Sequence, residues 1–318
     1  MEPPREEKYP PPERCKHKTL CRMSDSLTAS TLPERQALRE GPIWVTGAGG
    51  LIGHHVVKQC PGNRQVIGWL RRDLDLLDFG AVERQFKDRA PAAVIHCAAM
   101  SKSPQCEAQP QEAQAINVDA TRHLAQLSHS IPLIFLSTDL VFDGQKGHYA
   151  ENEAPHPLNT YARTKWEAEA VVAGNPHHTI VRTSLNGGIS PTGDRGFNEQ
   201  IQAALRKGTP IPLFVDEFRS PLAATVMARA LWEMLEKGLR GLYHLCGSQR
   251  LSRHAIGVLL NDRWRHDPSL IQATSLASYQ GPPRAPDTTL DCSKLQSMLS
   301  FPLPGFESWL ADHPESLF

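Results

Sequence analysis

The residues best suited to chemistry are a tyrosine and a lysine four positions apart. Tyr161 and Lys165 lie in the stretch 157–165, where this spacing puts both on one face of a helix. A free phenol has a pKa near 10, so acid chemistry at neutral pH needs a shift of about three units, or about 4 kcal/mol. An ammonium at about 4 Å can supply about that much. We therefore predict that Tyr161 is a general acid whose pKa is lowered by Lys165.

An isolated tyrosine and lysine at this spacing are more typical of an ordinary helix surface, so a catalytic role needs support from other residues. Thr138 directly follows an apolar stretch, 132–137, that predicts a buried strand. Open α/β folds bind their ligands at the carboxyl ends of such strands. We expect the chemistry to lie at this edge, with Thr138 beside the tyrosine and lysine.

A glycine-rich turn follows the first apolar strand. The stretch 43–45 runs into T-G-A-G-G-L-I-G at 46–53, after which the pattern is helical. Gly47 permits a tight turn, Gly50 lets backbone N–H groups approach a pyrophosphate, and Gly53 lets the helix pack closely on the strand. The dinucleotide-binding residues predicted here are Gly47, Gly50, Leu51, Ile52 and Gly53.

The second predicted strand, 65–70, ends in two arginines, Arg71 and Arg72. In dinucleotide folds this strand end faces the adenosine ribose, where an acidic residue accepts the ribose hydroxyls and an arginine pairs with a 2'-phosphate. The arginines therefore favour NADP as the cofactor. The alternative is a solvated strand end carrying ordinary charges, which the neighbouring Asp73 would also fit.

A third apolar stretch and a following helix extend the same pattern. The stretch 92–97 ends at Cys97 and is followed by Ala98 and Ala99, and these small side chains leave room for a cofactor. A helix is predicted at 111–128. Alternation of strands and helices predicts the α/β class. We expect a Rossmann-like doubly wound parallel sheet with a smaller C-terminal substrate-binding lobe.

Composition divides the chain into three parts. Residues 1–40 are rich in proline and charge without hydrophobic periodicity, so we expect a disordered extension. An NADP-binding Rossmann domain is predicted at 41–183, and a mainly substrate-binding lobe at 184–318. The predicted elements of that lobe are helices at 197–207 and 223–237 and a strand near 241–246 that returns to the main sheet.

Charge and composition exclude several classes of function. Lysine plus arginine and aspartate plus glutamate number 34 each, so no net field attracts nucleic acid or an anionic membrane. No apolar run approaches the length of a membrane span, and the N-terminus lacks an apolar signal core. The seven scattered cysteines are typical of a reduced set. We expect a cytoplasmic protein.

From 42 to about 295 the chain resembles the extended short-chain dehydrogenases/reductases, and within them the dTDP-4-dehydrorhamnose reductase-like family. Besides the glycine turn and the Tyr161/Lys165 pair, the motifs are D-L-L-D at 75–78, C-A-A at 97–99, N-V at 117–118, S-T-D at 137–139, V-F-D-G at 141–144, R-T-S at 182–184, S-P at 220–221 and the stretch 284–294. Their order and spacing are specific, whereas a lone Y-x-x-x-K would not be.

The resemblance implies a role for each matching residue. Thr138 is implied to hydrogen-bond the substrate carbonyl, Tyr161 to protonate its oxygen, and Lys165 to bind the nicotinamide ribose and lower the tyrosine pKa. NADPH is the implied hydride donor. The implied cofactor set further includes Asp75, Leu76, Cys97, Ala98, Ala99, Asn117 and Thr183. The implied substrate-binding residues are Asp143, Arg219 and Arg284, the arginines being suited to a diphosphate. No cluster of metal ligands is expected.

The function that follows is NADPH-dependent reduction of the 4-keto group of a nucleotide-linked deoxysugar. The chain is also similar to the regulatory beta subunit of methionine adenosyltransferase, for example at 94–99, 117–120 and 290–295. The alternative is therefore a regulatory subunit that binds NADP without catalysis. A sugar-nucleotide epimerase or dehydratase is less favoured because the motifs follow the reductase pattern. The sequence leaves open whether the protein forms a homodimer.

Overall fold

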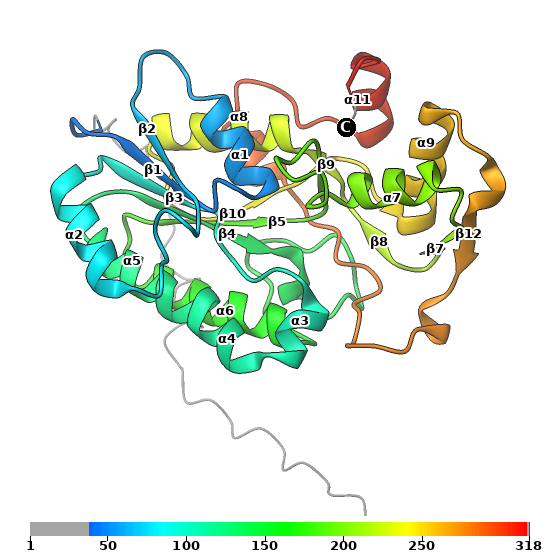
Figure 1. The fold of residues 1–318 in the computed structure, drawn as a ribbon, viewed down its shortest axis with the longest axis horizontal. Coiled ribbons are helices and arrows are strands. Elements are labelled where there is room, and N and C mark those ends of the chain that lie inside the picture. The colour runs from blue at the N-terminus through cyan, green and yellow to red at the C-terminus, as the bar shows by residue number, and fades with distance from the viewer. Residues whose placement is uncertain (1–37, 317) are drawn as a thin grey trace, which may run out of the picture. The chain divides into compact units, whose positions relative to one another are not determined.

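The computed structural model describes residues 38–316 and 318, which belong to one compact unit. The predicted extension at 1–40 therefore lies outside the described residues except for its last three. A single sheet of six parallel strands, ordered β10-β5-β4-β3-β1-β2, forms the centre (Figure 1). Its strands are β1 (Ile43–Thr46), β2 (Val66–Trp69), β3 (Ala93–His96), β4 (Leu133–Thr138), β5 (Thr179–Thr183) and β10 (Gly241–Leu245).

The strand order confirms the predicted doubly wound class. Strands β1, β3, β4 and β5 are buried along their whole length, as expected for a parallel sheet covered on both faces. From β1 the chain moves outward to β2 on one side and then returns to β3 on the other. The connections therefore diverge between β1 and β3, and the carboxyl ends of these two strands frame the crevice where such folds bind ligands.

Helices cover both faces of the sheet (Figure 1). Helices α1 (Leu51–Lys58) and α8 (Ala224–Glu236) pack together on one face, and α2 (Phe79–Arg89), α5 (Ala120–Leu127) and α6 (Thr160–Ala173) lie on the other. We predicted that 223–237 belongs to the smaller lobe, which is wrong. Leu231, Met234 and Leu235 of α8 share the hydrophobic core with Val45 and Val56 because the apolar face of the helix packs on the sheet and α1.

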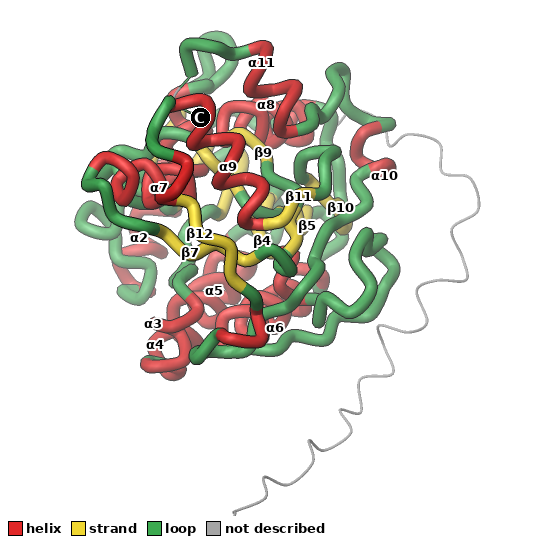
Figure 2. Tube along the Cα trace, turned by 90° about the vertical axis from the view of Figure 1, so that its right-hand side faces the viewer, coloured by secondary structure: helices red, strands yellow, loops and turns green. Residues whose placement is uncertain are grey.

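A smaller set of elements lies beyond one end of the sheet, on the side that faces the viewer in Figure 2. It consists of α7 (Phe197–Arg206), α9 (Arg253–Trp264), α11 (Phe306–Asp312), the paired strands β7 (Ile211–Phe214) and β12 (Ile271–Thr274), and the short strands β6 (Asn186–Gly187), β8 (Phe218–Arg219), β9 (Leu222–Ala223) and β11 (Leu251–Ser252). Its core packs Phe197, Ile201 and Leu213 against Ile256 and Trp309. The chain leaves this lobe after α7 to form α8 and β10, so the two parts interleave.

The predicted helix at 111–128 is interrupted in the structure. It consists of α4 (Pro110–Gln114), a π-helical turn at Ala115–Asp119, and α5. Helices α3 (Ser103–Ala108) and α10 (Ser293–Gln296) complete the set within residues 38–316. None of the helices that the structure describes is long and apolar enough to cross a membrane.

Candidate active site

The glycine turn after β1 forms a cradle of backbone. Gly47 has a φ of +68°, and a Cβ there would lie 2.7 Å from the Ala98 nitrogen at the end of β3. A Cβ on Gly53 would collide with the Gly47 carbonyl oxygen. Gly50 caps α1 without a side-chain hydrogen bond, so no side chain fills the helix N-terminus. This geometry fits the pyrophosphate of a dinucleotide, held by the amides of Leu51 and its neighbour Ile52.

A buried histidine that the sequence analysis overlooked holds the end of β3 beside this cradle. His96 Nδ1 lies 2.6 Å from Thr46 Oγ1, and its Nε2 lies 3.0 Å from Thr121 Oγ1. Burial lowers the pKa of His96 to about 3, so the ring is neutral at pH 7. Thr46 Oγ1 in turn accepts a hydrogen bond from the Ala98 amide at 3.3 Å. The network fixes the backbone where Cys97, Ala98 and Ala99 were predicted to face a cofactor.

The three predicted catalytic residues meet at the carboxyl edge of the sheet. Thr138 is the last residue of β4, and Tyr161 and Lys165 lie on α6, which packs against β4. The Thr138 side chain is close enough to the Tyr161 phenol to act on its pKa, and Lys165 Nζ lies 3.9 Å from the centre of the Phe135 ring. The structure thus places the threonine next to the phenol.

The predicted effect of Lys165 on the tyrosine is not what the structure shows. Burial raises the pKa of Tyr161 well above its ordinary value, although the Thr138 side chain acts to lower it. Burial also lowers the pKa of Lys165 to about 7, although the Glu169 carboxylate opposes this. Loss of water around each group is therefore the main cause of its pKa shift, and the tyrosine keeps its proton at neutral pH.

Two of the polar contacts that position α6 are close to the predicted site, and one of them is made by Asn117, which was predicted to belong to the cofactor set. Asn117, in the π-helical turn, accepts from the Met100 amide at 2.8 Å and donates to Thr164 Oγ1 at 3.0 Å. The side chain therefore joins α6 directly to the loop after β3. A π-helical turn at this point is typical of a functional site.

The second contact is a buried ion pair that the sequence analysis did not single out. Arg182 on β5 donates to Glu169 on α6 from both Nε at 2.9 Å and Nη2 at 2.7 Å. Glu169 is one helical turn beyond Lys165, so the pair aligns α6 with the sheet. The next residue of β5, Thr183, accepts from Asn186 Nδ2 at 3.0 Å at the edge of the site.

The residues predicted to bind the adenosine end follow β2 on the surface. Arg71 and Arg72 have side chains that are 70% and 82% exposed, and each lies more than 3.5 Å from its nearest carboxylate. Asp75 accepts from the Leu77 amide at 3.0 Å and thus fixes the turn that carries the partly buried Leu76. Both guanidinium groups are accessible to a phosphate.

Two arginines predicted to bind substrate line a small cavity of about 70 Å³. Its lining is Ser103, Leu140, Asn159, Arg219, Tyr279, Pro282, Pro283 and Arg284. Glu217, which is buried, lies 3.0 Å from Arg219 Nη2 and 2.6 Å from Arg284 Nε. Burial acts to raise the pKa of Glu217, but the hydrogen bond from Arg284 and the nearby charges hold it below its usual value. Two guanidinium groups thus share one carboxylate beside the cavity.

The third predicted substrate residue, Asp143, does not line this cavity. Its Oδ1 accepts from Tyr149 Oη at 2.8 Å and from the Gln145 amide at 3.0 Å. The carboxylate therefore braces the loop that follows V-F-D-G. The sequence motif located this residue near the site but did not show that its hydrogen bonds are satisfied within the loop.

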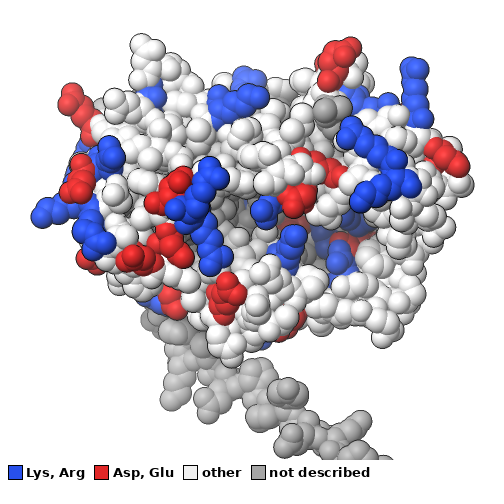
Figure 3. Space-filling model, in the orientation of Figure 1, with Lys and Arg blue, Asp and Glu red and all other residues white. Residues whose placement is uncertain are grey.

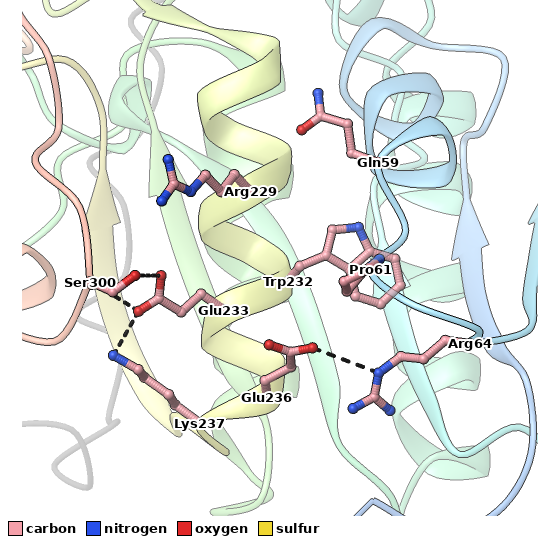
Figure 4. A pocket seen from close by; sticks show the side chains of 9 residues that line it. All are labelled: Gln59, Pro61, Arg64, Arg229, Trp232, Glu233, Glu236, Lys237 and Ser300. Atoms are coloured by element: carbon pink, nitrogen blue, oxygen red, sulfur yellow. Dashed lines mark hydrogen bonds and ion pairs between the residues drawn. The ribbon is translucent and has the colours of Figure 1, made fainter.

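A larger groove of about 630 Å³ lies between the end of α1 and α8 (Figure 4). Its charged groups face one another: Glu233 contacts Lys237 and Ser300, and Glu236 lies 3.7 Å from Arg64. No residue predicted for the active site lines it. On the face drawn in Figure 3, acidic and basic side chains are interspersed, in keeping with equal numbers of the two.

Comparison with known proteins agrees with this geometry. The chain is 30% identical over 278 residues to dTDP-4-dehydrorhamnose reductase from Sinorhizobium fredii, covering 83% of this chain and 93% of the relative. It is 29% identical over 285 residues to methionine adenosyltransferase 2 subunit beta from Xenopus laevis, covering 84% of each. In fold it is similar to dTDP-4-dehydrorhamnose reductase from Bacillus anthracis, solved in complex with NADP, with a TM-score of 0.81 at 22% identity, covering 86% of this chain and 98% of that one.

The family model described as "RmlD substrate binding domain" matches residues 41–317, which span the glycine turn, the Thr138, Tyr161 and Lys165 group, and the arginine-lined cavity. The chain belongs to this family of extended short-chain dehydrogenases/reductases.

Proposed function

We propose that this protein uses NADPH to reduce the 4-keto group of a nucleotide-linked deoxysugar. The observation that carries the proposal is the meeting of Thr138 and Tyr161 at the sheet edge, with Lys165 one helical turn away. The glycine cradle lies at the same edge, after β1, and the arginine-lined cavity includes Leu140, two residues beyond Thr138. These features support a reaction at this edge between a hydride donor, an acid and an anionic substrate.

The cofactor proposal has support from two separate features. The backbone cradle at Gly47 and Gly53 suits a pyrophosphate, and Arg71 with Arg72 suits a 2'-phosphate at the adenosine end. The similar Bacillus anthracis structure holds NADP. When bound, this cofactor supplies the hydride, so the protein contributes position and electrostatics.

The protein's own contribution is to hold and release one proton. Because burial raises the pKa of Tyr161, the phenol carries its hydrogen throughout the physiological range and can give it up only to a strong base. The oxygen of a ketone becomes such a base as it gains negative charge. Lys165, with a pKa of about 7, is charged in part of the population at neutral pH and then stabilises the phenolate.

The substrate class follows from the cavity charge. Arg219 and Arg284 offer planar, multiple donors that match phosphate oxygens, and Arg284 also lies 5.3 Å from the Tyr279 ring centre. A nucleotide-linked sugar supplies a diphosphate for the arginines and a ketone for the acid. The relative from Sinorhizobium fredii carries the name of a reductase of this substrate class.

The test is NADPH oxidation by the purified protein with dTDP-4-dehydrorhamnose. We expect turnover by wild type, and a loss of at least about 100-fold in Tyr161→Phe. Both proteins should show the same thermal stabilisation by NADPH. Arg89→Ala, a change on the exposed surface at the end of α2, serves as a control for general damage and should keep most of the activity.

A second candidate is a regulatory subunit, favoured by the 29% identity to methionine adenosyltransferase 2 subunit beta over 84% of the chain. A regulatory subunit would bind NADPH without turnover of any 4-keto sugar nucleotide. That result with wild-type protein would replace the reductase proposal with this one.

A further inference from the structure

Asp139 is a buried carboxyl group that is hydrogen-bonded to side chains from three parts of the chain. Its Oδ2 accepts from Ser184 Oγ and from Thr288 Oγ1, both at 2.7 Å. Its Oδ1 lies 3.2 Å from Thr138 Oγ1. The side chain is 5% exposed, so water does not compete for these contacts. A carboxyl group is thus built into the site next to the residue expected to contact the substrate carbonyl.

The Thr138 hydroxyl group can make its hydrogen bonds in two alternative ways. Its hydroxyl oxygen accepts from the Leu140 amide at 3.2 Å, which uses one of two lone pairs. If Asp139 is ionised, the hydroxyl hydrogen of Thr138 points to Asp139, and the remaining lone pair accepts from Tyr161. If Asp139 carries a proton, that proton fills the second lone pair, and the threonine hydrogen must point elsewhere.

The second arrangement is the one that suits reduction of a ketone. We propose that Asp139 keeps a proton on Oδ1 and donates it to Thr138, so that the threonine hydroxyl donates into the site, toward Tyr161 and the substrate oxygen. The proton belongs on Oδ1 because Oδ2 already accepts from two hydroxyl groups. Asp139 is then a positioning residue that acts through Thr138. This inference rests on the proposed function and names a further residue of that site.

The charges around Asp139 allow it to stay neutral. Burial raises its pKa, against the charge of Arg219 and the hydrogen bonds from Ser184, Thr288 and Thr138. Arg219 Nε lies 3.7 Å away, and its guanidinium is already paired with Glu217 at 3.0 Å. The other charged or titratable groups that face Asp139 are Tyr161 on α6, which is neutral, and Arg253 on α9.

A direct test is the infrared difference spectrum between wild type and Asp139→Asn at neutral pH, without substrate. We expect a carbonyl band of a protonated carboxylic acid that is present in wild type, absent in the variant, and shifted in D₂O. The band should persist above the pH at which an ordinary aspartate ionises. If the variant removes only a carboxylate band, the proposal is overturned. This measurement needs no turnover, so it decides the point even if the proposed reaction fails.

Kinetics with dTDP-4-dehydrorhamnose then separate this role from others. An asparagine amide can donate to Thr138 as the protonated acid does, so Asp139→Asn should keep kcat within about threefold and lose the alkaline fall that ionisation of Asp139 causes in wild type. Thr288→Val removes a donor to the ionised form, so it should move that fall to higher pH. A loss of about 100-fold or more in Asp139→Asn would instead show that the carboxyl group itself transfers a proton or acts as an anion.

Discussion

At the scale of single residues, burial sets the charge of the catalytic group. Tyr161 and Lys165 share one helix face, yet burial raises the pKa of the tyrosine and lowers the pKa of the lysine to about 7, and both shifts favour the neutral form. The sequence identified both residues from their spacing. It could not show the sign of the pKa shift of Tyr161, because that depends on how much water the folded chain removes.

The depressed pKa of Lys165 makes stability depend on pH. The unfolded lysine binds its proton up to a pH near 10.5, whereas the folded one releases it near 7. Between these values the unfolded state binds more protons, so the free energy of unfolding should rise with pH. We expect wild type to gain stability relative to Lys165→Met by up to about 1.4 kcal/mol per pH unit between about pH 7 and pH 9.

Denaturant titrations of both proteins at several pH values measure this difference. Groups common to the two proteins cancel in the comparison. If the free energy of unfolding changes with pH equally in both proteins, Lys165 keeps its proton in the folded chain, and it is then wrong that the lysine is only partly charged at neutral pH.

At the scale of elements, the site depends on how closely α1 approaches the strands. Gly53 packs against the Gly47 carbonyl oxygen with no space for a Cβ, and the glycine spacing predicted this contact from the sequence. The break of 111–128 by a π-helical turn was not predicted. Its cause is tertiary, because Asn117 reaches from that turn to Met100 and Thr164, which are remote in sequence.

A substitution tests the close approach. Gly53→Ala should force α1 away from the turn, lower the melting temperature and abolish stabilisation by NADPH, with a cost of about 1–3 kcal/mol in stability. Gly80→Ala, in the first turn of α2, is the matched control. A Cβ there meets only the flexible Arg84 side chain and the carboxylate of Asp78, so it should be neutral or slightly stabilising. Equal behaviour of the two variants would contradict the packing argument.

At the scale of the whole molecule, the chain interleaves a nucleotide-binding sheet with a smaller lobe. The parallel sheet and the returning strand β10 were predicted from the sequence, because buried parallel strands are short apolar runs between helices. The sharing of Glu217 between Arg219 and Arg284 was not predicted from the sequence, because β8 and the segment near 284 meet only in the folded chain. The assignment of α8 failed for the same reason.

Cofactor preference should appear as stabilisation of the whole fold. At equal concentration, a ligand that binds the native state more tightly raises the melting temperature more. We expect NADPH to stabilise wild type more than NADH at equal concentration, and Arg71→Ala with Arg72→Ala to reduce the NADPH effect to that of NADH. Arg89→Ala, a surface change at the end of α2, should leave it intact. Equal stabilisation of wild type by both cofactors would remove the 2'-phosphate argument.

The central claim is that Tyr161 gives a proton to a sugar ketone while a nicotinamide gives the hydride. The most direct measurement is transfer of deuterium from NADPH labelled at nicotinamide C4 to the sugar of dTDP-4-dehydrorhamnose, read by mass spectrometry and NMR. We expect deuterium at sugar C4 with wild type and none with Tyr161→Phe, although both bind NADPH. Bound NADPH that leaves the sugar unlabelled in the wild-type reaction would contradict it.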